Sequence, residues 1–111
     1  METKPIIYIV ATQCHPENEE KFNRWYNEIH IPMLLKFKGL TKVTRCEIVN
    51  ESEELPKYLA IYEFENQKAF EAFRTSPELN AAREEMSGTW QGKGFEVRWR
   101  VLYKPMKTWK R

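Results

Sequence analysis

Residues 22–32 read FNRWYNEIHIP, and this stretch predicts an amphipathic helix that ends close to a histidine. Apolar and aromatic side chains recur at the spacing of one buried helical face, at Phe22, Trp25, Tyr26 and Ile29. Pro32 disfavours helical backbone at the residue that precedes it. We therefore expect a helix that begins at about Pro16 and ends or bends at about His30.

His30 has two interpretations at this position. Its imidazole titrates near neutral pH, and beside Tyr26, one turn earlier on the helix, it can serve as a general acid or base. A histidine near a helix C-terminus also commonly caps the helix, because its cation suits the dipole and its N–H groups reach free carbonyls. We treat His30 and Tyr26 as candidate catalytic residues, with capping or core packing as the alternative.

The composition is typical of one folded domain that spans residues 1–111. Hydrophobic residues make up 41% of the chain and charged residues 31%, a balance that favours a globular chain over a disordered one. No apolar run reaches the roughly 20 residues of a membrane span, and the first five residues lack a signal-peptide pattern. We therefore expect a cytoplasmic protein, with reduced thiols at Cys14 and Cys46.

The charge of the chain gives little indication of a polyanionic partner. A formal net charge of +2 is too small to indicate binding to nucleic acid. Positive charge gathers only at the end of the chain, where Trp109 is surrounded by Lys104, Lys107, Lys110 and Arg111. This tail is either a solvated terminus or an arm that crosses a partner subunit.

The order of elements predicted along the chain is β-α-β-β-α-β. Strands are expected at residues 6–12, 41–49, 57–64 and 95–103. Asn66 is a good N-cap for the second helix, which Ser76 and Pro77 interrupt and which Gly88 ends. This order is typical of the ferredoxin-like α+β sandwich, in which two right-handed crossovers place both helices on one face of a four-stranded antiparallel sheet.

The strands indicate what covers the other face of that sheet. The last strand alternates, with one face formed by Phe95, Val97, Trp99, Val101 and Tyr103. Residues 6–11 and 58–62 do not alternate but are apolar throughout, which indicates strands buried on both faces. No further element remains to cover the second face, so we expect a homodimer in which two sheets pack together.

Two groups of residues carry a resemblance to a known family. The first runs from Phe22 through Trp25-Tyr26 and His30-Ile31-Pro32 to Gly39-Leu40, and the second comprises Phe70, Phe73 and Ser76-Pro77. With the element order, they resemble the dimeric α/β-barrel superfamily, and most closely its EthD-like branch. The resemblance implies a homodimeric barrel with a cleft in each subunit between the sheet and the helices.

The resemblance also implies a range of activities. Relatives include small isomerases, decarboxylases, polyketide cyclases and cofactor-free monooxygenases that act on aromatic or lactone-like compounds, as well as haem-binding branches. In the EthD-like pattern, the histidine of a Tyr-x-x-x-His-x-Pro segment is the usual candidate for chemistry. His30 matches that histidine, and Tyr26 matches the tyrosine.

Other aromatic residues are candidates for substrate binding, since rings make up 14% of the chain. Tyr8 and Tyr62 lie on predicted central strands, where each can donate a hydrogen bond to a developing enolate or simply pack on the sheet. Trp25 and Trp99 are candidates for the walls of a cavity, with core packing or the dimer interface as alternatives. Arg45 and Arg98 can bind an anionic group or lie at exposed strand positions.

The sequence gives little support to a cofactor. The potential metal donors lack zinc-like spacing, since no close pair occurs among Cys14, His15, His30 and Cys46. There is no glycine-rich phosphate loop, dinucleotide motif or nucleophile elbow, so we expect no nucleotide or flavin. Haem is a weaker alternative, because a single histidine can be its axial ligand.

Two hypotheses of different class follow from these observations. The first is a small cofactor-independent lyase, isomerase or cyclase that acts on a hydrophobic aromatic or lactone-like metabolite, with His30 as general acid or base. The second is a noncatalytic homodimer that binds a hydrophobic small molecule, with His30 as a helix cap. A haem-binding or monooxygenase-type protein is a third, less favoured hypothesis.

Overall fold

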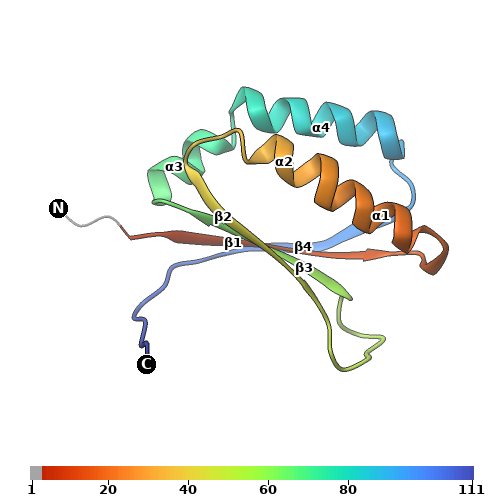
Figure 1. Cartoon of the computed structure of the whole chain (residues 1–111), viewed down its shortest axis with the longest axis horizontal. Helices are drawn as coiled ribbons and strands as arrows, with labels where there is room; N and C mark the ends of the chain where they lie inside the picture. The colour runs from red at the N-terminus through yellow and green to blue at the C-terminus, as the bar shows by residue number, and fades with distance from the viewer. Residues whose placement is uncertain (1–3) are drawn as a thin grey trace.

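The computed structural model describes residues 4–111 and shows a four-stranded antiparallel sheet with helices on one face (Figure 1). The strands are β1 (Ile6–Cys14), β2 (Leu40–Glu47), β3 (Tyr58–Phe64) and β4 (Phe95–Tyr103), in the spatial order β2-β3-β1-β4. The predicted ferredoxin-like order is confirmed. Residues 1–3, which belong to the segment without a signal-peptide pattern, lie outside the described residues.

The helical layer consists of two long segments, each built from shorter pieces. The first comprises a 3-10 turn (Pro16–Asn18), α1 (Glu19–Trp25), a π-helical turn (Tyr26–His30) and α2 (Ile31–Leu34). The second comprises α3 (Gln67–Phe73) and α4 (Pro77–Trp90). Among residues 4–111, no helix is long and apolar enough to cross a membrane.

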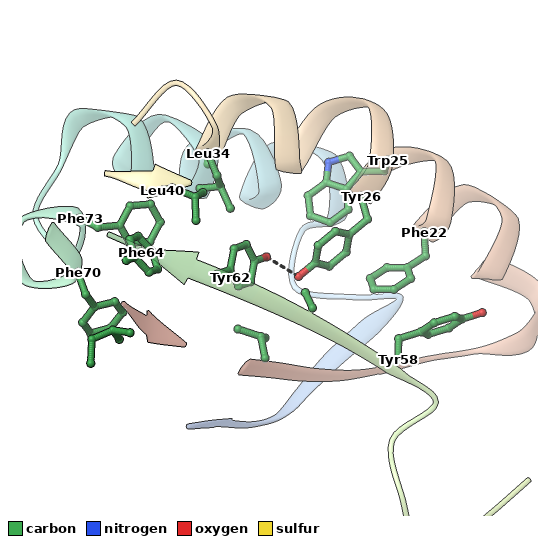
Figure 2. Close-up of a cluster of buried hydrophobic side chains, with 14 of the residues drawn as sticks. Phe22, Trp25, Tyr26, Leu34, Leu40, Tyr58, Tyr62, Phe64, Phe70 and Phe73 are labelled. Atoms are coloured by element: carbon green, nitrogen blue, oxygen red, sulfur yellow. Dashed lines mark hydrogen bonds between the residues drawn. The ribbon is translucent and has the colours of Figure 1, made fainter. Parts of the chain in front are cut away.

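The core between the two layers is built from aromatic rings (Figure 2). Phe22 is fully buried, with its ring centroid 5.4 Å from that of Tyr26 and 4.9 Å from that of Phe95. At the other end of the core, the ring of Phe64 packs 4.9 Å from that of Phe73. Interlocked rings at these separations hold the first helical segment and α3 against the sheet.

The first helix changes form at His30 rather than ending there, since the π-helical turn (Tyr26–His30) passes directly into α2 (Ile31–Leu34). Ile31 has helical backbone angles (φ −60°, ψ −46°), and its N–H donates to the carbonyl of Tyr26, five residues earlier. Pro32 therefore lies in the first turn of α2, where a missing N–H is tolerated. The wider π-helical turn leaves room for the proline ring, so the helical path continues to Leu34.

The π-helical turn also changes which residues face the core. Trp25 and Tyr26 are buried as predicted, but Ile29 is 42% exposed. Its predicted burial rests on α-helical spacing, and that spacing is lost where the hydrogen bonds span five residues rather than four. Ile29 consequently points away from the sheet.

The predicted N-cap at Asn66 and the predicted interruption at Ser76 are confirmed, and Ser76 also caps α4. The side chain of Asn66 accepts a hydrogen bond from the N–H of Ala69 at 2.8 Å, and Ser76 Oγ accepts one from the N–H of Leu79 at 3.1 Å. The predicted end at Gly88 is wrong, because α4 continues to Trp90. Gly88 lies inside the helix on its exposed side, where a glycine is tolerated.

A β-bulge divides the faces of β4. Trp99 pairs with Ala11 and Val97 pairs with Thr12, so Arg98 has no partner on β1. The extra residue reverses the alternation, and the prediction that Phe95, Val97, Trp99, Val101 and Tyr103 share one face is wrong. Phe95 and Val97 pack under the helices, whereas the three later residues lie on the opposite face with Ile7, Ile9 and Ala11.

The centre of the sheet face opposite the helices is apolar, in agreement with the lack of alternation in β1 and β3, and polar residues such as Lys42 and Glu63 lie at its edge. No helix among residues 4–111 lies over it (Figure 1). The face includes Ile7, Ile9, Ala11, Leu59, Ile61, Trp99, Val101 and Tyr103. Trp99 is 43% exposed and Tyr103 58% exposed on this face, which we call the open face.

Candidate active site

A cavity of about 380 Å³ lies between the sheet and the helices. Its floor includes Val10 on β1 and Val97 on β4, and helical residues such as Leu34 and Met86 line it from above. The cavity is thus where the family resemblance implies a cleft, and most of its wall is apolar. A cavity of this size and polarity is suited to a small organic molecule.

Five of the six candidate site residues line this cavity: Tyr8, Trp25, Tyr26, His30 and Tyr62. Trp99 does not. It lies on the open face beside Cys46 and Leu59, so it is not part of this cavity, and the dimer interface is the alternative that applies to its position. The bulge at Arg98 is the reason, because it reverses the direction of every side chain that follows it on β4.

His30 lies against two aromatic rings. It stacks on Trp25, with ring centroids 4.7 Å apart and an interplanar angle of 24°, and it meets Tyr26 edge to face at 5.1 Å. Its Nδ1 atom is buried and has no hydrogen-bond partner among residues 4–111. The helix also continues past His30, and the imidazole makes no capping hydrogen bond, so the structure does not support the capping interpretation.

Burial determines the protonation state of His30. Loss of solvation lowers its pKa from the usual 6.5 to about 4, against a smaller opposing effect from the carboxylate of Glu85. That carboxylate accepts a hydrogen bond from Trp25 Nε1 at 2.8 Å. At neutral pH the imidazole is therefore uncharged, with one nitrogen as a donor and the other as an acceptor.

Tyr26 and Tyr62 form a hydrogen-bonded pair in the cavity wall. Their hydroxyl oxygens lie 2.8 Å apart, and the two side chains point toward one another from the first helical segment and from β3 (Figure 2). Burial raises the pKa of both phenols, that of Tyr62 well above its usual value, so both keep their protons. One hydroxyl donates to the other, which leaves the proton of the second available to a bound molecule.

Tyr8 completes the aromatic wall near the cavity mouth. Its ring centroid lies 5.2 Å from that of Phe70 and 5.9 Å from that of Tyr62. Burial raises the pKa of the Tyr8 phenol, and the positive charges of three nearby arginines act in the opposite direction. These arginines, which also line the cavity, are Arg100, Arg83 and Arg74.

The two arginines singled out from the sequence lie elsewhere. Arg45 does not line the cavity: its guanidinium lies 4.4 Å from the centre of the Tyr26 ring, and its Nη1 donates to Asn27 Oδ1 at 3.0 Å. Arg98 is the bulge residue and forms an ion pair with Glu96 at 2.8 Å. Neither is placed to bind a molecule in the cavity.

The sequence contains a signal for only part of the arginine set. Arg83 lies on α4 within one turn of both Leu79 and Met86, two residues of its apolar stripe, so its position could have been inferred from helical spacing. The position of Arg100 could not be inferred in this way, because simple alternation along β4 places its side chain on the wrong face of the sheet. No group of three His, Cys, Asp or Glu side chains in the described part of the chain is arranged to hold a metal ion.

A difference in pH dependence between variants tests the burial of His30. Between about pH 6.5 and about pH 4, the unfolded chain binds a proton at His30 that the folded protein excludes, so lowering the pH costs stability. Since one pKa unit corresponds to about 1.4 kcal/mol, this loss reaches about 3 kcal/mol at pH 4. His30→Gln should lack this loss. As the pH falls from 6.5 to 4, urea unfolding should therefore show the free energy of unfolding of the variant rising relative to that of the wild type.

His15→Gln is the matched control, because it removes the other histidine, which is exposed. Its unfolding free energy should follow that of the wild type across this range. Parallel curves for the wild type and His30→Gln would show that the imidazole of His30 is solvated in the folded protein, contrary to the geometry of the cavity.

Solved structures of other proteins share this fold over almost the whole chain. An EthD family protein from Bacillus halodurans is 17% identical, with a TM-score of 0.67, over 91% of this chain and 99% of its own. HapK from Hahella chejuensis is 9% identical, with a TM-score of 0.73, over 96% and 97%. SnoaB, a cofactor-independent oxygenase from Streptomyces nogalater, is 14% identical, with a TM-score of 0.61, over 96% and 97%.

These likenesses confirm the resemblance to EthD-like proteins at the level of the fold. No curated protein matches the chain. The family described as a domain of unknown function (DUF4286) matches residues 5–103. Because that match covers nearly the whole chain, the protein belongs to the DUF4286 family.

Proposed function

We propose that the protein is a small cofactor-independent enzyme of the lyase, isomerase or cyclase type, in which His30 exchanges a proton with a hydrophobic aromatic or lactone-like substrate. The observation that carries the proposal is a neutral imidazole that lines an apolar cavity together with two hydrogen-bonded tyrosine hydroxyls. A titratable group whose pKa is shifted by burial beside such a cavity is typical of an acid–base site.

The surrounding groups suit removal of a proton next to a carbonyl. The free lone pair of His30 accepts the proton, and the hydroxyl of the Tyr26–Tyr62 pair that is not used within the pair donates to the oxygen on which negative charge develops. With a pKa of about 4, the resting imidazole is a weak base. An enolate formed beside it raises that pKa, because an opposite charge stabilises the imidazolium, and apolar walls strengthen the attraction.

An oxygenase is the second candidate. The fold shared with SnoaB, which is described as a cofactor-independent oxygenase, supports it. The same base and hydroxyls would serve an oxygenation that begins with removal of a proton from the substrate. The products distinguish the two candidates, because only the oxygenase consumes dioxygen.

We also propose that two copies of the chain pair through the open face. Ile9 and Ile61 are neighbours in the register of β1 and β3 at its centre, and Trp99 and Tyr103 extend the apolar surface across β4. A contiguous apolar area over the central strands of a sheet is typical of a protein interface rather than of a surface in water. Sheet-on-sheet packing by a second copy buries this area with twofold symmetry.

Light scattering tests the dimer. The wild type should have a mass near twice 13.4 kDa, and Ile9→Glu or Ile61→Glu should dissociate or unfold it, because each places a charge between two sheets. Ala81→Glu, at an exposed position on α4, is the control and should remain dimeric. A folded wild-type monomer at micromolar concentration would rule out this pairing.

Hydrogen exchange tests proton transfer whatever product the enzyme forms. In D₂O, the wild type should catalyse deuterium incorporation next to the carbonyl of a substrate found by screening phenolic and lactone-like compounds, as followed by NMR. His30→Gln should reduce the rate by about 10² to 10⁴ while the ligand still binds, and Tyr26→Phe should reduce it less. The rate should rise with pH through about 4 and then level off, because only the neutral imidazole accepts a proton.

The control for this experiment is His15→Gln, whose exposed side chain lies outside the cavity. It should exchange the substrate at the wild-type rate. An unchanged rate in His30→Gln would exclude His30 as the base and would favour the noncatalytic binding protein.

A further inference from the structure

The cavity mouth is positively charged on three sides. Arg74 follows α3, Arg83 lies on α4 and Arg100 lies on β4, so three separate elements bring their guanidinium groups to one cavity. All three residues are exposed, which places their charged ends at the rim rather than in the apolar interior. Arginine side chains commonly extend in this way, with the stem on apolar surface and the charge in water.

Little negative charge offsets this cluster. Arg74 pairs with Glu71 at 3.4 Å, but within residues 4–111 neither Arg83 nor Arg100 has a carboxylate within ion-pair distance. No aspartate or glutamate is among the residues that line the cavity. The positive charge of the rim therefore favours binding of an anion whose apolar part can fill the interior of the cavity.

The bulge in β4 is what places Arg100 there. The register pairs Arg100 with Val10, which faces the helices and lines the cavity. Without the extra residue at Arg98, the alternation that begins at Phe95 would direct Arg100 to the open face. Bulges commonly occur beside functional sites, where they redirect a side chain.

We propose that the ligand of this cavity is an amphipathic organic carboxylate, with its apolar body in the cavity and its carboxylate between Arg83 and Arg100 at the mouth. Arg74 and the Tyr8 hydroxyl lie at the same rim and add to the recognition of the anion. The planar guanidinium matches a carboxylate with two parallel hydrogen bonds, which explains the use of arginine. The inference rests on the proposed function in that it names the substrate class of the same cavity.

A matched pair of probes separates the charge from the apolar body. Naphthalene-2-carboxylate and naphthalene-2-carboxamide have nearly the same shape and differ in charge, and isothermal titration calorimetry gives both affinities. The carboxylate should bind the wild type at least about tenfold more tightly. Arg83→Gln and Arg100→Gln should each lower the affinity for the carboxylate by about three- to tenfold and leave the affinity for the amide unchanged.

Arg24→Gln is the charge-matched control, because Arg24 is exposed on α1, pairs with Glu20 at 3.0 Å and does not line the cavity. It should change neither affinity. Equal affinities for the two probes, an equal effect of Arg24→Gln and Arg100→Gln, or no binding of either probe would each overturn the inference. His30→Gln should keep the preference for the carboxylate, so an unchanged exchange rate in that variant would contradict the proposed function and leave this inference standing.

Discussion

The π-helical turn from Tyr26 to His30 is the constraint on which the cavity depends. Pro32 cannot donate a backbone hydrogen bond, and its ring requires space that a regular α-helix does not leave. The wider turn provides that space, and the N–H of Ile31 bonds five residues back instead of four. As a result Tyr26 and His30 both face the sheet, with their rings 5.1 Å apart, while Ile29 turns outward.

The chemistry of the cavity depends on keeping water away from this turn. Trp25 covers one face of the His30 ring, and the aromatic core below it includes Phe22 and Phe95. In such surroundings charge is costly, which is why the imidazole is neutral and the phenols of Tyr26 and Tyr62 keep their protons. The same surroundings strengthen any interaction with charge that develops on a bound substrate. Among the residues that line the cavity, the charged side chains of the resting protein are arginines that remain in contact with water.

Features that depend on local backbone chemistry can be predicted from the sequence. The strands can be predicted from their β-branched and alternating residues. Asn66 and Ser76 can be identified as helix N-caps, because their side chains accept a backbone hydrogen bond at a helix start. The apolar character of β1 on both faces is readable as well. Five of the six candidate residues line one cavity, because their elements and faces follow from these signals.

Features that depend on irregular backbone cannot be predicted in the same way. Nothing in residues 22–32 distinguishes a helix that ends before Pro32 from one that widens to accommodate it, so the π-helical turn is not predicted. Nothing in residues 95–103 marks the bulge, since an extra residue is defined only by its pairing with β1. That single irregularity moves Trp99 out of the cavity and Arg100 into it.

The central claim is that His30 is a neutral imidazole, buried against aromatic rings in the wall of the cavity. The most direct measurement is an NMR titration of isotopically labelled histidine in His15→Gln, where His30 is the one remaining histidine. The ring resonances of the folded protein should stay those of the neutral form as the pH falls through 6.5, and should move only near pH 4. A midpoint near 6.5 in the folded protein would contradict the account, because it would show an imidazole that solvent reaches freely.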